Sequence, residues 1–298
     1  MMLKHLFDNI YIIMTDKNGQ FPFSCCFYID DEVKTIIDTP IDTRFVDLFQ
    51  ELPVDLIINT HFHLDHCGCN YLFPQAKIMA HPHDIPAMQS LAVFEDYYGY
   101  KKYNAPDMLL SWLKWHPSNI SAAIQDGDII DLGKVKLEVI HTPGHTAGHC
   151  ALYWREKEVL FSGDIDLTGF GPWYGNDVSD VDQLITSIEK LIALDPKVIL
   201  SGHKGIIDTN IKTRLLKYLH KVYANEKAIL NALDIPLTLD QLVYHKIIYG
   251  RWHQPKSMFY FFEQVSLIVH LRRLLRIGLV EEIGDKYRVT KQKHCIQS

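Results

Sequence analysis

The chain has 298 residues, 47% of them hydrophobic, and a formal net charge of −6 at pH 7. This length allows one large domain or two smaller ones, and the acidic balance gives no overall basic surface for nucleic acid. No apolar run approaches the roughly 18 residues of a membrane span, and Asp8 and Asn9 interrupt the N-terminal apolar stretch before it reaches the length of a secretory signal, which predicts a cytoplasmic protein.

Strands and helices alternate over the first two thirds of the chain. Short apolar runs predict strands at 10–14, 25–29, 35–37, 55–59, 78–81, 135–140, 150–154, 159–162 and 197–201. Helices are expected over 44–51 and after Ser179, which would be the N-cap of the second helix with Asp182 at its N3 position. This alternation predicts an α/β domain over residues 1–210.

Residues 84–119 break the alternation and read as an insertion. They combine partly helical patterns with seven aromatic side chains: Phe94, Tyr97, Tyr98, Tyr100, Tyr103, Trp112 and Trp115. Two interpretations are open. The segment is either a lid over a site or a packed helical layer.

After residue 211 the pattern changes to three helices and a hairpin. The helices are expected over 211–233, from Thr238 to about 248, and over 256–277, and the hairpin over 278–290 turns about Gly284. Three helices followed by a hairpin indicate a small winged-helix-like domain at 211–298.

The charged residues of this C-terminal segment give conflicting indications about nucleic-acid binding. Arg272, Arg273 and Arg276 lie at helical spacing and could meet phosphates. Acidic residues, among them Glu281 and Glu282, stand in the hairpin. We therefore expect this domain to pack against the rest of the chain or to form a homodimer. A nucleic-acid-binding domain is the alternative.

A histidine-rich motif, THFHLDH, follows the strand expected at 55–59. His61 and His63 alternate in extended chain and so share one face. If a helix begins near Asp65, then Asp65 and His66 project toward a neighbouring point. One turn of the chain can thus provide ligands for two metal ions. Imidazole and carboxylate ligands together suit zinc, iron or manganese.

Further candidate ligands stand just past the ends of other expected strands, each in a glycine-containing turn: His145, Asp164 and His203. Four other histidines compete with them: His81, His83, His141 and His149. The first two form an HxH pattern but lack the following Asp-His, so we expect loop or supporting roles for them. His149 is expected to support the turn that holds His145.

The cysteines give a weaker signal. Cys67 and Cys69 flank Gly68 beside the motif, but a lone CxC is a weak indication of zinc. Two near-adjacent pairs among the six cysteines make poor geometry for a disulfide framework. Reduced thiols, and again a cytoplasmic protein, are expected.

The ordered set of seven residues resembles the full ligand set of the metallo-β-lactamase superfamily, over roughly residues 5–210. The resemblance implies a four-layer αβ/βα sandwich and two divalent ions, with zinc as the first choice and iron or manganese as alternatives. It implies these ligands: His61, His63 and His145 for one ion, Asp65, His66 and His203 for the other, and Asp164 as the bridge. Asp38 matches an early aspartate of the family that supports the ligands.

The expected chemistry is hydrolysis, because paired cations bring the pKa of water toward neutrality. Asp65 would orient the hydroxide and move a proton. In the segment 169–176, Tyr174 would either donate a hydrogen bond to a developing oxyanion or pack beneath the lid. The aromatic surroundings favour a small ester, thioester or lactone as the substrate.

Other activities within the superfamily are less favoured. The diiron oxygen and nitric oxide reductases usually have Glu where His63 stands, whereas the motif does not separate this chain from the persulfide dioxygenases. The C-terminal segment is similar to a winged-helix domain appended to one branch that includes an endoribonuclease. A nuclease or phosphodiesterase, and a ligand-sensing DNA-binding regulator, are therefore the alternatives. The β-CASP insertion of dedicated nucleases does not fit between His145 and His203.

Overall fold

The computed structural model describes residues 3–15, 19–41, 46–106 and 115–290. Its first sheet has seven strands in chain order: β1 (Leu3–Phe7), β2 (Ile10–Ile13), β3 (Cys26–Ile29), β4 (Thr35–Ile37), β5 (Leu56–Ile58), β6 (Lys77–Ala80) and β7 (Ala122–Ala123). Strands β4 to β7 run parallel to one another, so their carboxyl ends meet at one edge of the sheet.

The second sheet has six strands: β8 (Ile129–Asp131), β9 (Lys136–His141), β10 (Cys150–Trp154), β11 (Val159–Gly163), β12 (Val198–Ser201) and β13 (Gly205–Ile207). Its order runs from β13 through β12, β11, β10 and β9 to β8, and β11 and β12 are parallel. The two sheets face each other across an apolar core in which the rings of Phe27 and Phe161 meet edge to face at 5.5 Å.

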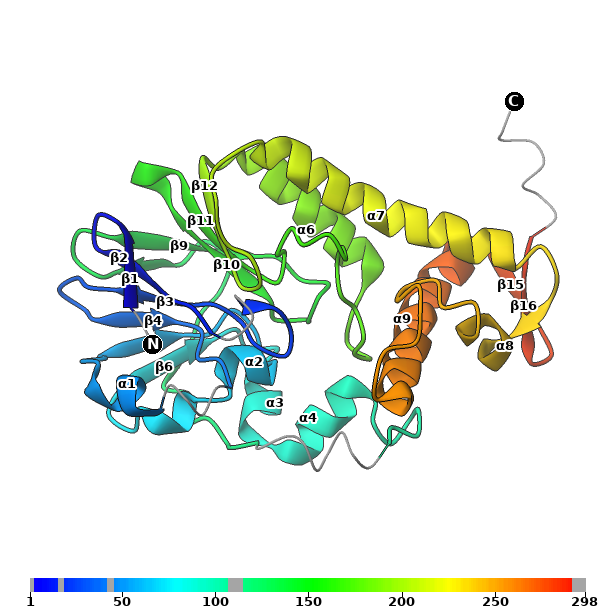
Figure 1. The fold of residues 1–298 in the computed structure, drawn as a ribbon, viewed down its shortest axis with the longest axis horizontal. Coiled ribbons are helices and arrows are strands. Elements are labelled where there is room, and N and C mark those ends of the chain that lie inside the picture. The colour runs from blue at the N-terminus through cyan, green and yellow to red at the C-terminus, as the bar shows by residue number, and fades with distance from the viewer. Residues whose placement is uncertain (1–2, 16–18, 42–45, 107–114, 291–298) are drawn as a thin grey trace.

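Helices cover the outer faces of both sheets (Figure 1). The helices near the first sheet are α1 (Val46–Glu51), α2 (Leu64–Cys67), α3 (Ile85–Gln89) and α4 (Leu91–Tyr98). Against the second sheet pack α6 (Val181–Leu194) and α7 (Ile211–Ala232), which bury Leu184, Ile188 and Leu215 with Leu160. This confirms the predicted four-layer αβ/βα sandwich.

The C-terminal part contains the elements expected from the pattern. After α7 come β14 (Leu237–Thr238), α8 (Leu239–Val243), α9 (Lys256–Arg276), β15 (Val280–Ile283) and β16 (Lys286–Val289). Strand β16 lies between β14 and β15 in a three-stranded sheet. Thr238 caps α8 through a capping box with Gln241, although α8 ends five residues earlier than predicted. The winged-helix name stays a prediction.

The sandwich and the C-terminal helices share one apolar core. Figure 1 shows α7 running from the sheets to the C-terminal hairpin. Ile188 of α6 and Leu274 of α9 belong to the same buried cluster. The division of the chain at residue 210 stays a prediction.

The arginines of α9 are paired with acidic side chains of this chain. Arg272 donates to Asp177 and to the hydroxyl of Tyr103. Arg273 donates to Glu226 at 2.6 and 2.8 Å and to Asp182, which also pairs with Arg276. The three guanidinium groups that could meet phosphates therefore hold α9 against its neighbours.

The structure corrects several details of the prediction. The cap of α6 is Asp180, whose carboxylate accepts from the backbone of Gln183, and the Ser179 hydroxyl instead donates to the carbonyl of His145. Five strands were not predicted, and each of them lies at the edge of its sheet: β1, β7, β8, β13 and β14. In the 84–119 insertion, Phe94 and Tyr98 are buried in the core, which favours the packed layer; Trp112 lies outside the described residues.

The described part of the chain contains no helix that combines the length and apolarity needed to cross a bilayer.

Candidate metal centre

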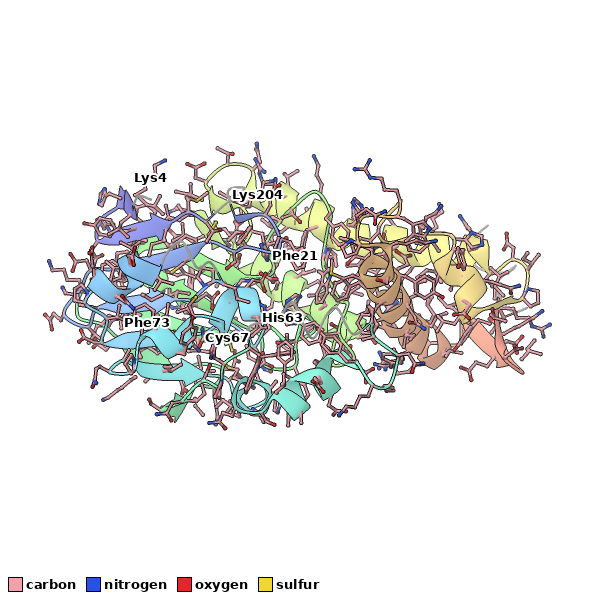
Figure 2. All side chains as sticks on the ribbon, turned by 60° about the horizontal axis from the view of Figure 1, so that its bottom comes forward. Lys4, Phe21, His63, Cys67, Phe73 and Lys204 are labelled. Carbon is pink, nitrogen blue, oxygen red and sulfur yellow. The ribbon has the colours of Figure 1, made fainter. Side chains whose placement is uncertain are left out.

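The histidine motif forms the corner between β5 and α2. His63 is the N-cap residue of α2 and has extended backbone angles (φ −63°, ψ 144°), so His61 and His63 leave the strand end on the same side. Both side chains are buried, and Nε2 of His61 lies 3.1 Å from Nδ1 of His63. Figure 2 shows His63 at α2, on the side of the sheets nearest the C-terminal helices.

A first cluster forms where His145 and Asp164 join these two histidines. Nε2 of His145 lies 2.9 Å from Nδ1 of His63 and 3.3 Å from Nε2 of His61. Asp164 Oδ2 lies 3.3 Å from Nε2 of His145. The four ligand atoms all lie within 4.8 Å of one another. Three nitrogen atoms and one oxygen atom thus surround a single point, as a metal ion requires.

A second cluster, of Asp65, His66 and His203, lies beside the first. Nε2 of His203 lies 3.6 Å from Oδ2 of Asp65. Asp164 faces this cluster with its other oxygen, Oδ1, which lies 3.0 Å from Nε2 of His66 and 3.3 Å from Nε2 of His203. The structure therefore brings all seven predicted ligands together, with Asp164 between the two clusters.

Hydrogen bonds to the ring nitrogens that face away from the clusters fix the tautomers of His61 and His66. Nδ1 of His66 donates to Asp38 Oδ2 over 2.7 Å, and Asp38 also accepts from the Thr60 hydroxyl, which in turn accepts from Nδ1 of His61. Because Nδ1 carries the proton, Nε2 of both rings keeps a lone pair for a cation. Asp38 thus supports two ligands, as the resemblance implied.

The same pattern holds two further ligands through backbone carbonyls. Nδ1 of His145 donates to the carbonyl of Trp173 over 2.8 Å, and Nδ1 of His203 donates to those of Gly19 and Phe23. His63 differs, because its Nδ1 faces the cluster while its Nε2 contacts the side-chain amide of Asn176 at 3.2 Å. Neither Trp173 nor Asn176 was assigned a supporting role from the sequence.

Two buried atoms indicate that cations belong here. Nε2 of His66 and Oδ1 of Asp164 have no hydrogen-bond partner among the described residues, although they lie only 3.0 Å apart. Unpaired buried polar atoms are costly, and a divalent ion between them would satisfy both. The residues present therefore fit a metal centre.

The charge states of the ligands differ between the two clusters. Burial, followed by the neighbouring histidines, holds the pKa values of His61 and His63 well below the usual range, so both rings are neutral. Burial alone would raise the pKa of Asp164, but His203 and His66 bring it well below the usual value. Neutral imidazole and ionised carboxylate are the forms that bind metal. His66 and His203 differ from the first two histidines: burial would lower their pKa values, but Asp164 and the neighbouring carboxylates raise them, so both rings must release a proton when an ion binds.

His149 and the cysteines have supporting positions. Nδ1 of His149 donates to the carbonyl of Thr142, and its Nε2 accepts from the backbone N–H of Asp164, so His149 holds the turn beside the first cluster as predicted. The Cys67 thiol donates to the carbonyl of Phe62, and neither Cys67 nor Cys69 belongs to a ligand cluster among the described residues. The five described cysteines form no disulfide with one another.

The structure corrects the predicted role of Tyr174. Its side chain is fully buried, its hydroxyl accepts a hydrogen bond from Asn225 of α7 over 2.8 Å, and its ring meets His270 of α9 edge to face. The neighbouring Trp173 lies at the metal centre instead, with its ring 5.3 Å from that of His63. Loop 169–176 therefore turns Tyr174 into the core, in agreement with the packing alternative.

We expect Tyr174→Phe to leave kcat within about twofold of the wild type and to lower the free energy of unfolding by about 1 kcal/mol, because it removes one buried hydrogen bond. Urea unfolding and steady-state kinetics measure the two effects. A lower kcat with unchanged stability would instead support a hydrogen bond from the Tyr174 hydroxyl to the developing oxyanion.

Asp84 is a supporting residue that the sequence analysis missed. Its buried carboxylate accepts from the backbone of Phe62 at 3.0 Å, from the backbone of Gly148 at 2.7 Å and from the hydroxyl of Thr146. It thereby joins the histidine motif to the loop of His145. Little in the sequence indicated it, because Asp84 lies four residues past the end of β6, whereas Asp38 directly follows β4.

We expect Asp84→Ala to lower the free energy of unfolding by about 3 kcal/mol, because two buried backbone N–H groups lose their acceptor. Denaturant unfolding of the metal-free protein measures this. Asp96→Ala, an exposed change on α4, is the matched control and should stay within about 0.5 kcal/mol of the wild type. Equal stability of the two variants would contradict this role.

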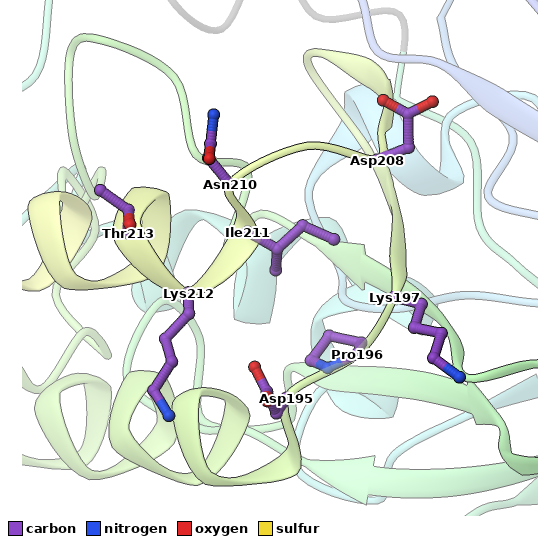
Figure 3. Close-up of a pocket in the computed structure, with 8 residues that line it drawn as sticks. All are labelled: Asp195, Pro196, Lys197, Asp208, Asn210, Ile211, Lys212 and Thr213. Atoms are coloured by element: carbon purple, nitrogen blue, oxygen red, sulfur yellow. The ribbon is translucent and has the colours of Figure 1, made fainter.

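An open surface pocket lies elsewhere, between the end of α6 and the start of α7 (Figure 3). It is lined by these residues: Asp195, Pro196, Lys197, Asp208, Asn210, Ile211, Lys212 and Thr213. None of them is a predicted site residue, and we assign the pocket no role.

The sandwich and its paired His/Asp clusters define a metallohydrolase-type α/β protein. Residues 20–203 match the family model described as the metallo-beta-lactamase superfamily. Because the match covers more than half of the chain, the chain belongs to this superfamily. The predicted superfamily and fold are thus confirmed.

Curated relatives share part of the chain. Hydroxyacylglutathione hydrolase GloC of Haemophilus influenzae is 30% identical over 195 residues, which cover 61% of this chain and 86% of that protein. The acyl-coenzyme A thioesterase MBLAC2 of Homo sapiens is 28% identical over 158 residues, which cover 50% of this chain and 55% of that protein. These relatives are hydrolases, as expected for the predicted enzyme class.

Solved structures share the fold over nearly the whole chain. A metallo-beta-lactamase family protein from Thermus thermophilus has a TM-score of 0.70 at 22% identity and covers 95% of this chain and 99% of its own. A beta-lactamase domain protein from Burkholderia ambifaria has a TM-score of 0.72 at 19% identity and covers 95% of this chain and 91% of its own. The similarity therefore includes the C-terminal helices.

Proposed function

We propose that this protein is a dinuclear metal-dependent hydrolase of small thioesters, within the broader class of esters, thioesters and lactones. The observation that supports it best is the convergence of seven ligand side chains in two clusters that share Asp164. The reaction adds water to the thioester carbonyl and releases a carboxylic acid and a thiol. No serine or cysteine nucleophile is required.

The first ion would be held by His61, His63 and His145, the second by Asp65, His66 and His203, and both by Asp164. When bound, two divalent ions supply water of lowered pKa and polarise a carbonyl oxygen. Zinc is the first choice for this ligand set, and iron and manganese remain alternatives.

Asp65 is the residue proposed to handle the proton. Its Oδ2 lies 3.6 Å from Nε2 of His203 and 4.0 Å from Nε2 of His66, and its side chain is 14% exposed. Burial raises its pKa, which suits a group that accepts a proton from water. The carboxylate would orient the attacking water and take its proton.

Aromatic side chains around the first cluster support an apolar substrate group. The ring of Tyr98 lies 5.2 Å from that of His63, on which the ring of Trp173 also packs edge to face. Trp173 is fixed by a hydrogen bond from its Nε1 to the hydroxyl of Tyr249. Aromatic side chains at this place suit binding of an apolar acyl group better than binding of a polyphosphate. The names of the relatives, an acyl-coenzyme A thioesterase and a hydroxyacylglutathione hydrolase, support a thioester.

A nuclease is the less favoured alternative. Arg272, Arg273 and Arg276 form ion pairs with Asp177, Glu226 and Asp182 and are therefore poorly available to phosphates. No observation favours a DNA-binding regulator. A cytoplasmic location and a homodimer stay predictions.

A substrate panel tests the proposal. The purified protein is incubated with acyl-coenzyme A and acyl-glutathione thioesters, lactones, a phosphodiester and labelled RNA at low salt. We expect thioester hydrolysis that a chelator abolishes and that is lost in His61→Ala but kept in His245→Ala, an exposed histidine of the C-terminal part. RNA cleavage that depends on His61, without turnover of any thioester, would overturn the proposal.

A further inference from the structure

Loop 169–176 holds two ligands of the first cluster through one residue, Trp173. Nδ1 of His145 donates to the carbonyl of Trp173 over 2.8 Å, and the indole of Trp173 packs edge to face on the ring of His63 at 5.3 Å. The indole also lies 5.8 Å from the ring of His145. Trp173 therefore contacts two of the three histidines proposed for the first ion.

The indole of Trp173 is in turn held by the C-terminal part of the chain. Its Nε1 donates to the hydroxyl of Tyr249 over 2.9 Å, and its ring packs on that of Phe262 of α9 at 5.4 Å. Gly175 leaves room for this arrangement, because a Cβ there would lie 2.5 Å from Cζ2 of Trp173 and 3.2 Å from Cδ1 of Phe262. The indole thus contacts both α9 and the ligand histidines.

Tyr249 stands in the segment between α8 and α9, and a buried carboxylate holds the backbone of that segment. Glu263 of α9 is fully buried and accepts from the backbone N–H groups of Ile248 and Tyr249, each over 3.0 Å. Burying a carboxylate is costly unless hydrogen bonds offset the cost. These two bonds therefore favour one position of the segment and, with it, of the Tyr249 hydroxyl.

The histidines of the second cluster are supported from a different part of the chain. His66 donates to Asp38, and His203 donates to the carbonyls of Gly19 and Phe23. These acceptors lie in residues 19–38, far in sequence from α8 and α9. A change at Tyr249 is therefore expected to act on the first ion and not on the second.

We propose that Glu263 and Tyr249 are positioning residues for the first metal ion and act through Trp173. Glu263 holds the backbone of Tyr249, and the hydroxyl of Tyr249 holds the indole of Trp173. Trp173 then keeps His145 and His63 in the orientation that the first ion requires. The C-terminal part of the chain thereby controls the affinity of one ion of the pair. This inference rests on the proposed metal centre but not on the proposed thioesterase activity.

Zinc affinity in variants that keep a single site, measured by competition with a chromophoric chelator, tests the proposal. His203→Ala keeps the three histidines of the first ion, and His61→Ala keeps the ligands of the second. Combined with His203→Ala, Tyr249→Phe should weaken zinc binding about tenfold, the lower end of what residues that support ligands contribute. Combined with His61→Ala, it should leave the affinity unchanged. Unchanged affinity in the first combination, or equal weakening in both, would overturn the proposal.

A double-mutant cycle separates this role from a general effect on folding. Trp173→Phe removes the indole N–H, so adding Tyr249→Phe to it should weaken first-ion binding by less than about twofold further. Tyr244→Phe, an exposed change near the end of α8, is the matched control and should keep the wild-type affinity. Full, independent effects of the changes at 173 and 249 would contradict the connection between them.

Solvent exchange of histidine ring protons, followed by NMR on the zinc-free protein, tests the positioning without any ion. Tyr249→Phe removes the hydroxyl, and Glu263→Gln leaves one oxygen for two backbone N–H groups. We expect both to speed exchange of Nδ1–H of His145 at least about threefold, through easier local opening, and to leave that of His66 unchanged. Equal exchange in variants and wild type would overturn the proposal. Faster exchange without zinc binding in His203→Ala would support the positioning and count against the metal centre.

Discussion

Replacing Asp164 by alanine is expected to reduce the bound metal from two ions to one or fewer and to lower kcat by about a thousandfold. Asp164 is the one carboxylate that faces both clusters, with Oδ1 at 3.0 Å from His66 and Oδ2 at 3.3 Å from His145. Its loss removes a ligand from each ion and the charge that offsets both. A thousandfold loss corresponds to about 4 kcal/mol of transition-state stabilisation, within the several kcal/mol that metal catalysis supplies.

Elemental analysis of the purified variant measures the metal, and hydrolysis of the best thioester substrate measures kcat. Asp208→Ala, an exposed change just after β13, is the matched control and should keep both values. Two bound ions with wild-type kcat in Asp164→Ala would contradict the bridging assignment.

Replacing Asp65 by asparagine is expected to lower kcat by about a hundredfold to ten-thousandfold, with a much smaller change in KM. Asparagine keeps an oxygen that can face the second cluster but cannot accept the proton of an attacking water. General acid–base groups contribute this range of rate. Since Tyr98 and Trp173, the aromatic residues proposed to contact the acyl group, are unchanged, substrate binding should persist.

The metal content of Asp65→Asn is measured together with its kinetics. The expected result is two ions and low kcat, which separates proton transfer from metal binding. Loss of the second ion would make Asp65 a ligand first, and unaltered kcat with two ions would remove it from the catalytic step.

The ligand set was predictable from the sequence because of where the strands end. Asp38 follows β4 and His61 follows β5, which is parallel to it, so both stand at the same edge of the first sheet. Asp164 and His203 follow the parallel strands β11 and β12 in the same way. The strand ends therefore marked the candidate residues, and the resemblance to the superfamily assigned them to two ions.

Side-chain direction in loops was not predictable. Tyr174 and Trp173 are neighbours in the sequence, yet Tyr174 packs on α7 and α9 while Trp173 reaches His63. Which of the two side chains packs in the core depends on where the C-terminal helices α7 and α9 lie, and the local sequence does not show this. The histidines at 81 and 83 were noticed as an HxH pattern, but His141, whose ring stacks on that of His81, comes from the other sheet, and a pattern along one chain does not reveal that pairing.

The most direct test of the central claim is an anomalous difference map, recorded at the absorption edge of the bound metal on crystals of the purified protein. We expect two peaks at the metal centre, one among His61, His63 and His145 and one among Asp65, His66 and His203, with Asp164 between them. The absence of a peak among the first three histidines, with the rings hydrogen-bonded to water or protein instead, would contradict it.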